Sequence, residues 1–227
     1  MYDFDGGLPA ETDDALELAS SMESPSPGTA ITGGWAAIEG LLIRPGEGSY
    51  YEAADRLAAL VACSFPRAEM TPLAYRHIEA SDDDLAHQIR EATTNKQKVL
   101  LVERHLSSGG LLTLTDNSDI AAQNRMLALV ANKAQGLERI RRYVTESLRR
   151  LYNQRNVIAH SGSLRSVTLE ATLRTSPILV GAGLDRIVHG QLQVGHQLTP
   201  LSLVARAEVE LRMVGTSGGR ELASLLD

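Results

Sequence analysis

The run LERIRRYVTESLRRLYNQRNVIAHSG, residues 137–162, decides the fold of this chain. Its apolar residues recur every three or four positions, which is the spacing of one helix face; they are Leu137, Ile140, Val144, Leu148, Leu151, Tyr152 and Ile158. The other side carries five basic residues, Arg139, Arg141, Arg142, Arg149 and Arg150. Such a helix buries its apolar stripe against other elements. Ser161-Gly162 predicts its end, because glycine readily adopts the left-handed conformation that closes helices.

The rest of the sequence predicts more helices. Apolar spacing predicts them over residues 31–44, 49–64, 96–106, 166–174, 178–193 and 200–214, and over 118–160 with a break near Gly136. Pro66 is expected to end the second of these, while Thr71-Pro72 and the run Ser81-Asp82-Asp83-Asp84 have the residue types that begin helices. Aromatic residues are only 4% of the 227, which disfavours a β-sandwich, so an all-α bundle is expected.

The first 28 residues differ from the rest in composition. They contain seven acidic residues and no basic one, since the first basic residue is Arg44. They end in the linker-like run Ser24-Pro25-Ser26-Pro27-Gly28. We therefore expect an acidic, flexible extension or linker over 1–28, followed by one helical domain over 29–227. The acidic start outweighs the net charge of −6, so the overall acidity does not argue against binding of a polyanion by the remaining chain.

Several classes of protein are disfavoured by what the sequence lacks. Cys63 is the single cysteine, the start has no signal-peptide pattern, and no apolar run approaches eighteen residues, so a cytoplasmic location without membrane contact is expected. No ATPase-type phosphate loop occurs, and Gly181-Ala182-Gly183 lacks the third glycine of a dinucleotide site. Cys63 and the six histidines show no paired zinc spacing, so neither a metal nor a cofactor is predicted.

The most informative residues for chemistry are Arg155, Asn156 and His160. Histidine transfers protons near neutral pH, and arginine can hold a phosphate with two parallel hydrogen bonds. Asn156 precedes His160 by four residues and so lies on the same side of the helix, where it can orient the ring. Five residues separate Arg155 from His160, which places them roughly 140° apart on an ideal helix. They converge only if the helix loosens near His160 or if a second subunit completes the site.

Three segments resemble the HEPN superfamily (higher eukaryote and prokaryote nucleotide-binding domains), in particular its Apea-like group. The run LYNQRNVIAHSG, residues 151–162, resembles the family's Arg-Asn-x-x-x-His motif, with Ser161 where glycine is common. The runs WAAIEGLL, residues 35–42, and RLAALVA, residues 56–62, resemble two earlier helices of the group. The resemblance covers about residues 35–162 and implies an all-α HEPN-like bundle to which the later helices are additional.

The resemblance implies a homodimer in which two such motifs face a shared cleft. Active members are metal-independent endoribonucleases, often in anti-phage or toxin–antitoxin systems. It implies that Arg155, Asn156 and His160 are catalytic and that RNA is cut to 2′,3′-cyclic phosphate and 5′-OH ends. The RNA-binding surface is expected to comprise Arg139, Arg141, Arg142, Arg149, Arg150 and Tyr152.

Two other interpretations remain open at this point. The chain can be a non-catalytic HEPN module for dimerisation or nucleotide binding, regulated by a protein partner or forming the C-terminal part of a larger defence protein. Alternatively, His160 only caps the end of a helix, where the helix dipole favours a cation, while Arg155 pairs with an acid such as Glu39. In that case Tyr152 belongs to the core and the arginines form a solvated face.

Overall fold

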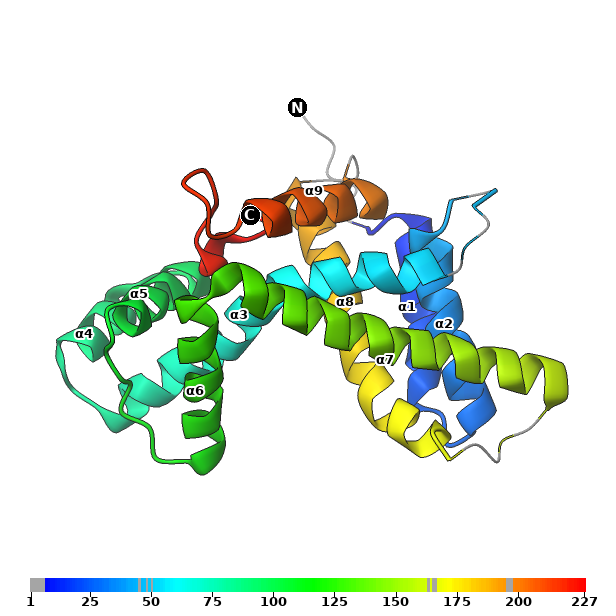
Figure 1. The fold of residues 1–227 in the computed structure, drawn as a ribbon, viewed down its shortest axis with the longest axis horizontal. Helices are drawn as coiled ribbons and strands as arrows, with labels where there is room; N and C mark the ends of the chain where they lie inside the picture. Colours follow the sequence, from blue (N-terminus) through cyan, green and yellow to red (C-terminus); the bar gives the residue numbers. More distant parts are fainter. Residues whose placement is uncertain are drawn as a thin grey trace. The chain divides into compact units, whose positions relative to one another are not determined.

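The computed structural model describes residues 7–44, 46–47, 49, 51–162, 164, 167–194 and 198–227 (Figure 1). These residues form nine α-helices and two short 3-10 helices with no strand among them, so the predicted all-α class is confirmed. Within the same residues, no helix combines the length and the apolar character that crossing a membrane requires.

The chain divides into two compact units. The first unit combines the ranges 1–61 and 141–206, and the second combines 62–140 and 207–227.

The N-terminal region of the first unit is more ordered than the expected linker. Its described part forms α1 (Ala10–Ser20) and the 3-10 helix η1 (Ser21–Glu23), which lead into α2 (Pro27–Leu42). Thr12, Ala15 and Met22 are buried, and α1 packs against α2, as the blue helices of Figure 1 show. Ala15 of α1 is therefore part of the core, whereas Leu16 and Leu18 of the same helix are exposed.

The core of the first unit is built by α2, the beginning of α3 (Tyr51–Ala80), the end of α7 (Lys133–Ser161) and α8 (Leu169–Val194). Fully buried side chains from these helices are Ile31, Trp35, Ile38, Leu42, Leu57, Leu148 and Leu151. A Cβ at Gly183 would overlap the side chain of Leu57, so only glycine allows α8 to approach α3 this closely.

Two predicted interruptions are wrong: the end of a helix at Pro66 with a new start at Thr71-Pro72, and the gap between the predicted helices 166–174 and 178–193. The helix α3 continues through Pro66 and Pro72, and α8 continues through Pro177. A proline inside a helix costs about 3 kcal/mol, mainly because one backbone hydrogen bond is lost. Burial on both sides outweighs that cost: Cys63 and Met70 are buried around Pro66, and Ser176 and Val180 are buried around Pro177.

The second unit contains α4 (Asp84–Glu91), α5 (Asn95–Ser107), α6 (Asn117–Ala131) and the 3-10 helix η2 (Leu222–Ser224), while α9 (Pro200–Met213) spans the division between the units. Within the predicted helix-starting run, Asp83 is the N-cap of α4, since its side chain accepts from the backbone N–H of Ala86. The predicted break near Gly136 falls one turn earlier, at Asn132 between α6 and α7.

A buried carboxylate connects three segments of the second unit. Glu103 on α5 is 1% exposed and forms a 2.7 Å ion pair with Lys133 at the start of α7. It also accepts the backbone N–H groups of Leu222 and Ala223 at 3.0 and 2.9 Å. A buried charge is stable only when it is paired and hydrogen-bonded in this way, so Glu103 fixes the C-terminal segment in place.

Candidate functional site

The residues predicted to be catalytic lie in the last turns of α7, which end where the sequence predicts. The helix runs through Ser161, and Gly162 has a φ of +62°. The N–H of Gly162 donates to the carbonyl of Ile158 at 2.9 Å, which is the hydrogen bond of a left-handed C-cap. The Ser161 hydroxyl also donates back to Val157 at 2.6 Å. The helix is therefore regular up to its last residue and does not loosen near His160.

Arg155 lies on the inner side of α7. It follows Leu148 and Leu151 by seven and four residues, which places it on the same side of the helix as these core residues. Its side chain is half-buried, and its Nη1 donates to Oδ1 of Asn156 at 3.1 Å. No carboxylate of the described residues is within ion-pair distance of Arg155, so the alternative pairing with Glu39 is not found.

His160 lies on the exposed side of the same helix. Because α7 is regular, the five-residue separation directs His160 and Arg155 about 140° apart, and one chain does not bring them together. Among the described residues His160 has no hydrogen-bond partner, and Asn156 bonds to Arg155 rather than to the His160 ring. Of the two routes to convergence that the sequence leaves open, only completion by a second subunit remains.

The five predicted RNA-binding arginines occupy different environments. Arg139 and Arg142 are exposed, whereas Arg141 is half-buried. Arg149 donates to both carboxylate oxygens of Asp55, at 3.0 and 2.9 Å, and its guanidinium lies 5.2 Å above the Tyr51 ring. Arg150 donates to the Ser147 hydroxyl at 2.9 Å. Arg139 belongs to the second unit and the other four to the first.

Tyr152 is part of an aromatic cluster in the first unit. Its half-buried ring lies 4.8 Å from that of Trp35 and 5.2 Å from that of Tyr51, in tilted and edge-to-face arrangements. The Tyr51 hydroxyl also donates to Asn153 at 3.3 Å. Such pairs stabilise a core beyond the area that they bury. Two neighbours therefore occupy much of the surface that Tyr152 would offer to an RNA base.

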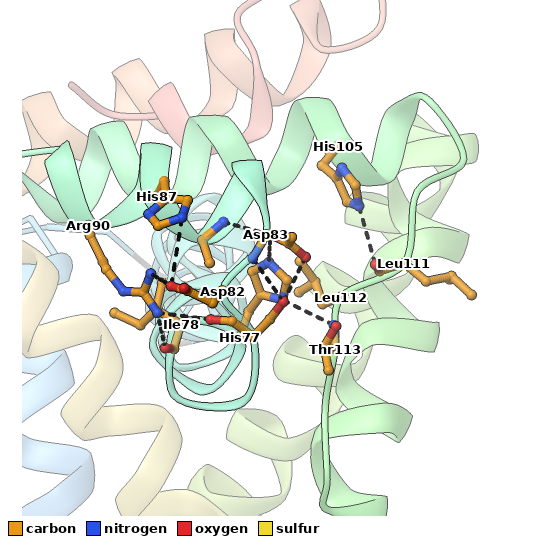
Figure 2. A network of polar contacts seen from close by, with 12 residues as sticks. His77, Ile78, Asp82, Asp83, His87, Arg90, His105, Leu111, Leu112 and Thr113 are labelled. Atoms are coloured by element: carbon orange, nitrogen blue, oxygen red, sulfur yellow. Dashed lines mark hydrogen bonds and ion pairs between the residues drawn. The ribbon is translucent and has the colours of Figure 1, made fainter.

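The His77 cluster of the second unit consists of His77, Asp83 and Thr113, and both ring nitrogens of His77 are hydrogen-bonded within it (Figure 2). His77 is 1% exposed, and its Nδ1 accepts the backbone N–H of Thr113 at 3.0 Å. Its proton is therefore on Nε2, which lies 3.2 Å from Oδ1 of Asp83. Nearby, Arg90 bonds Asp82 and two backbone carbonyls. Neither nitrogen of His77 is available to a substrate.

A depression of about 820 Å³ opens beside the end of α7, where Ile158 forms part of its wall. The rest of the wall comes from α1, η1 and α2: Asp14, Glu17, Leu18, Ser21, Gly28, Thr29, Thr32 and Gly33. The carboxylates of Asp14 and Glu17 would repel a phosphate backbone. This hollow is therefore unsuited to RNA although it adjoins the motif.

A smaller groove of about 290 Å³ lies between α7 and α8 and includes residues that sequence reasoning missed. Its lining residues are Tyr143, Val144, Ser147, Thr175, Ile178 and Leu179. Tyr143 is 64% exposed and Ile178 is 72% exposed, which is unusual for such large apolar groups. The sequence signal that could have identified Tyr143 is its position between the predicted arginines, with three before it and two after it.

Comparison with known proteins finds no family model, no curated protein and no solved structure that matches this chain. Among the described residues, no group of three or more His, Cys, Asp and Glu side chains is arranged to hold a metal ion. Arg155, Asn156 and His160 therefore remain the candidate site on the strength of their residue types and positions.

Proposed function

We propose that this chain is a metal-independent endoribonuclease of the HEPN type, acting as a homodimer in the cytoplasm in anti-phage defence or a toxin system. The observation that carries the proposal is the position of the Arg155-Asn156-x-x-x-His160 run at the end of α7. His160 is exposed and has no partner among the described residues, while Arg155 is half-buried and held by Asn156. A free imidazole can transfer a proton and a positioned guanidinium can stabilise negative charge, and the proposed cleavage uses both.

The chemistry needs no metal because RNA carries its own nucleophile. The 2′-OH attacks the adjacent phosphorus as a base removes its proton, and the bond to the 5′ oxygen breaks as that oxygen gains a proton. His160 would transfer one of these protons, a role typically worth 10²–10⁴-fold in rate. Arg155 would neutralise the extra negative charge on the five-coordinate phosphorus. The products are a 2′,3′-cyclic phosphate and a 5′-OH end.

The proposed site requires two chains. Arg155 and His160 diverge by about 140° on one regular helix, so a single chain would leave the phosphate in contact with only one of them. In a twofold dimer the same surface of each chain meets its copy, and Arg155 of one subunit can face His160 of the other. Two equivalent composite sites would then form.

The first test is cleavage of single-stranded and structured RNA in EDTA. We expect the native chain to cut and His160→Ala to lose cleavage, with 2′,3′-cyclic phosphate and 5′-OH ends on the products. His87→Ala is the matched control, because His87 is also an exposed histidine on a helix but lies outside the motif. Equal cleavage by the native chain and His160→Ala would contradict the proposal.

Mixed dimers test whether the site is shared between chains. When Arg155→Ala and His160→Ala chains are refolded together, half of the dimers are mixed, and each of these has one site with both native residues. Cleavage should then return to about a quarter of the native value, although each variant alone is inactive. A site contained within one chain would give no recovery.

A second candidate function is a non-catalytic HEPN module for dimerisation or nucleotide binding. The divergence of Arg155 and His160, and the engagement of Arg149 by Asp55, favour it. Under this alternative RNA stays intact under all conditions, while sedimentation still shows a dimer or a complex with a partner. A monomer at micromolar concentration that binds no nucleotide would contradict it.

A further inference from the structure

The groove between α7 and α8 presents an aromatic ring to solvent. Tyr143 is 64% exposed and forms one wall, and Ile178 of α8 is 72% exposed and forms part of the other. The volume of about 290 Å³ is just below the range of roughly 300–1,000 Å³ for small-molecule pockets. A slot of this size with apolar walls is suited to a single planar ring.

The edge of the groove is cationic. Tyr143, Ser147 and Arg150 follow one another at intervals of four and three residues, so they align on one side of α7. The Ser147 hydroxyl donates to the carbonyl of Tyr143 at 2.8 Å and accepts from Arg150 at 2.9 Å, which holds the guanidinium beside the groove. Its remaining N–H groups can contact an anion.

Arg142, next to Tyr143, is a second exposed cation on this helix. Neither Arg142 nor Arg150 has a carboxylate of the described residues within ion-pair distance. Glu146 is also exposed on this side, so the local balance is two arginines to one acid. On α8, Arg174 is neutralised by Glu170 at 2.7 Å. Positive charge around an aromatic slot fits a ligand that combines planar rings with negative charge.

The geometry points to this groove as a binding site for single-stranded RNA, in which an unpaired base stacks on Tyr143 while flanking phosphates contact Arg142 and Arg150. This inference rests on the proposed function and names the form of its substrate: unpaired RNA, since a base within a duplex cannot reach the ring. Bases stack on aromatic side chains with little sequence preference, and arginines along a groove follow the backbone. A protein partner would fit the apolar walls but gains nothing from the cationic edge.

The test is equilibrium binding of a fluorescein-labelled oligoadenylate of about 12 nucleotides, a length that covers typical single-strand footprints. All proteins carry His160→Ala so that binding is measured without cleavage. Tyr143→Ala is expected to weaken binding roughly 5- to 100-fold, while Tyr143→Trp retains it. Tyr143→Leu is the decisive control, because it keeps an apolar surface but removes the ring. Its binding should be weakened as in Tyr143→Ala.

The arginines are tested by the dependence of binding on salt. Each lost phosphate contact should reduce the slope of log K against log salt by about 0.7 for a single strand. Arg142→Gln and Arg150→Gln are expected to show this change, and Arg212→Gln, an exposed arginine of α9, is expected not to. When the oligoadenylate is annealed to its complementary strand, the affinity of the duplex should be the same for the Tyr143→Ala variant and its parent.

The outcomes separate this inference from the proposed function. Equal RNA binding by Tyr143→Ala, Tyr143→Leu and the parent overturns the groove assignment even if the native chain cleaves RNA. Conversely, Tyr143-dependent binding by a chain that never cleaves RNA supports the groove and overturns the nuclease. If Tyr143→Ala instead lowers the dimer fraction in sedimentation and leaves RNA binding unchanged, the groove is a protein interface and the inference is wrong.

Discussion

Two histidines in different parts of the molecule illustrate how environment separates a structural role from a chemical one. His77, in the second unit, is buried and has both ring nitrogens engaged, with Asp83 and with the backbone of Thr113 (Figure 2). His160, in the last turn of α7 in the first unit, is exposed and has no partner among the described residues. The two residues are chemically identical, but only His160 can accept or donate a proton to a substrate.

The comparison shows that the surroundings of a titratable group decide its role. The His77 ring joins the end of α3, the start of α4 and the segment that precedes α6. Its hydrogen bonds are satisfied internally, so its removal should alter the fold more than any reaction. His160 contributes no such bonds, and its removal should alter a reaction more than the fold.

The largest expected effect is on catalysis and concerns His160. We expect His160→Ala to lower RNA cleavage by about 10²–10⁴-fold, the usual contribution of general acid or base catalysis. Its urea unfolding midpoint should stay within experimental error of the native value. A large loss of stability in this variant would show that the His160 imidazole has a structural role like that of His77, which would contradict the difference drawn between the two residues.

The next effect concerns His77 and should have the opposite character. His77→Ala removes a buried side chain together with two hydrogen bonds and is expected to cost about 1–3 kcal/mol in the free energy of unfolding. Activity per folded molecule should be unchanged. His87→Ala is the control, since this exposed side chain lies 3.7 Å from Asp82 and its loss should change stability by less than about 0.5 kcal/mol.

A smaller effect is expected at the cap that ends α7. Gly162 has a φ of +62°, and an alanine there would cost about 1 kcal/mol because its Cβ disfavours this conformation. Gly162→Asn should cost less, because asparagine tolerates the left-handed region. Gly40→Ala is the matched control: it is helical, its new Cβ meets no atom within 4 Å, and thermal unfolding should show a gain instead of a loss.

The smallest effect is the pH dependence of the His77 cluster. Hydrogen bonds from the Ala86 backbone N–H and the Ser81 hydroxyl lower the pKa of Asp83 from 3.8 to about 2. Because the pKa is lowered on folding, the charged carboxylate stabilises the protein above about pH 4, and this contribution disappears as the pH falls to about 2. The half-exposed side chain keeps the effect well below that of His77→Ala.

Thermal unfolding at a series of pH values measures this difference. The native chain should lose stability between pH 4 and pH 2 relative to Asp83→Ser, which keeps an N-cap acceptor but has no titrating group at this position. A constant difference across this interval would show that the ionisation of Asp83 does not contribute to the stability of the cluster.

The predictable parts of the fold are those in which local signals and burial agree. The end of α7 at Ser161-Gly162 follows from the glycine conformation, and α5 follows from its apolar spacing and its Thr94 and Gln97 capping box. The predicted helix end at Pro66 is wrong, and so is the predicted gap between residues 174 and 178, in which Pro177 lies. Proline is a local signal, whereas the burial of residues such as Met70 and Val180 that overrides it is a tertiary effect.

The sequence by itself determined the all-α class, the position of the candidate site and the divergence of Arg155 from His160, because helical periodicity is a local property of the chain. Only the tertiary structure decided which side chains are available. In the folded chain Arg149 pairs with Asp55, Tyr152 packs against two aromatic rings, and Tyr143 stays exposed over a groove. Availability depends on contacts between residues distant in sequence, and no local pattern encodes those contacts.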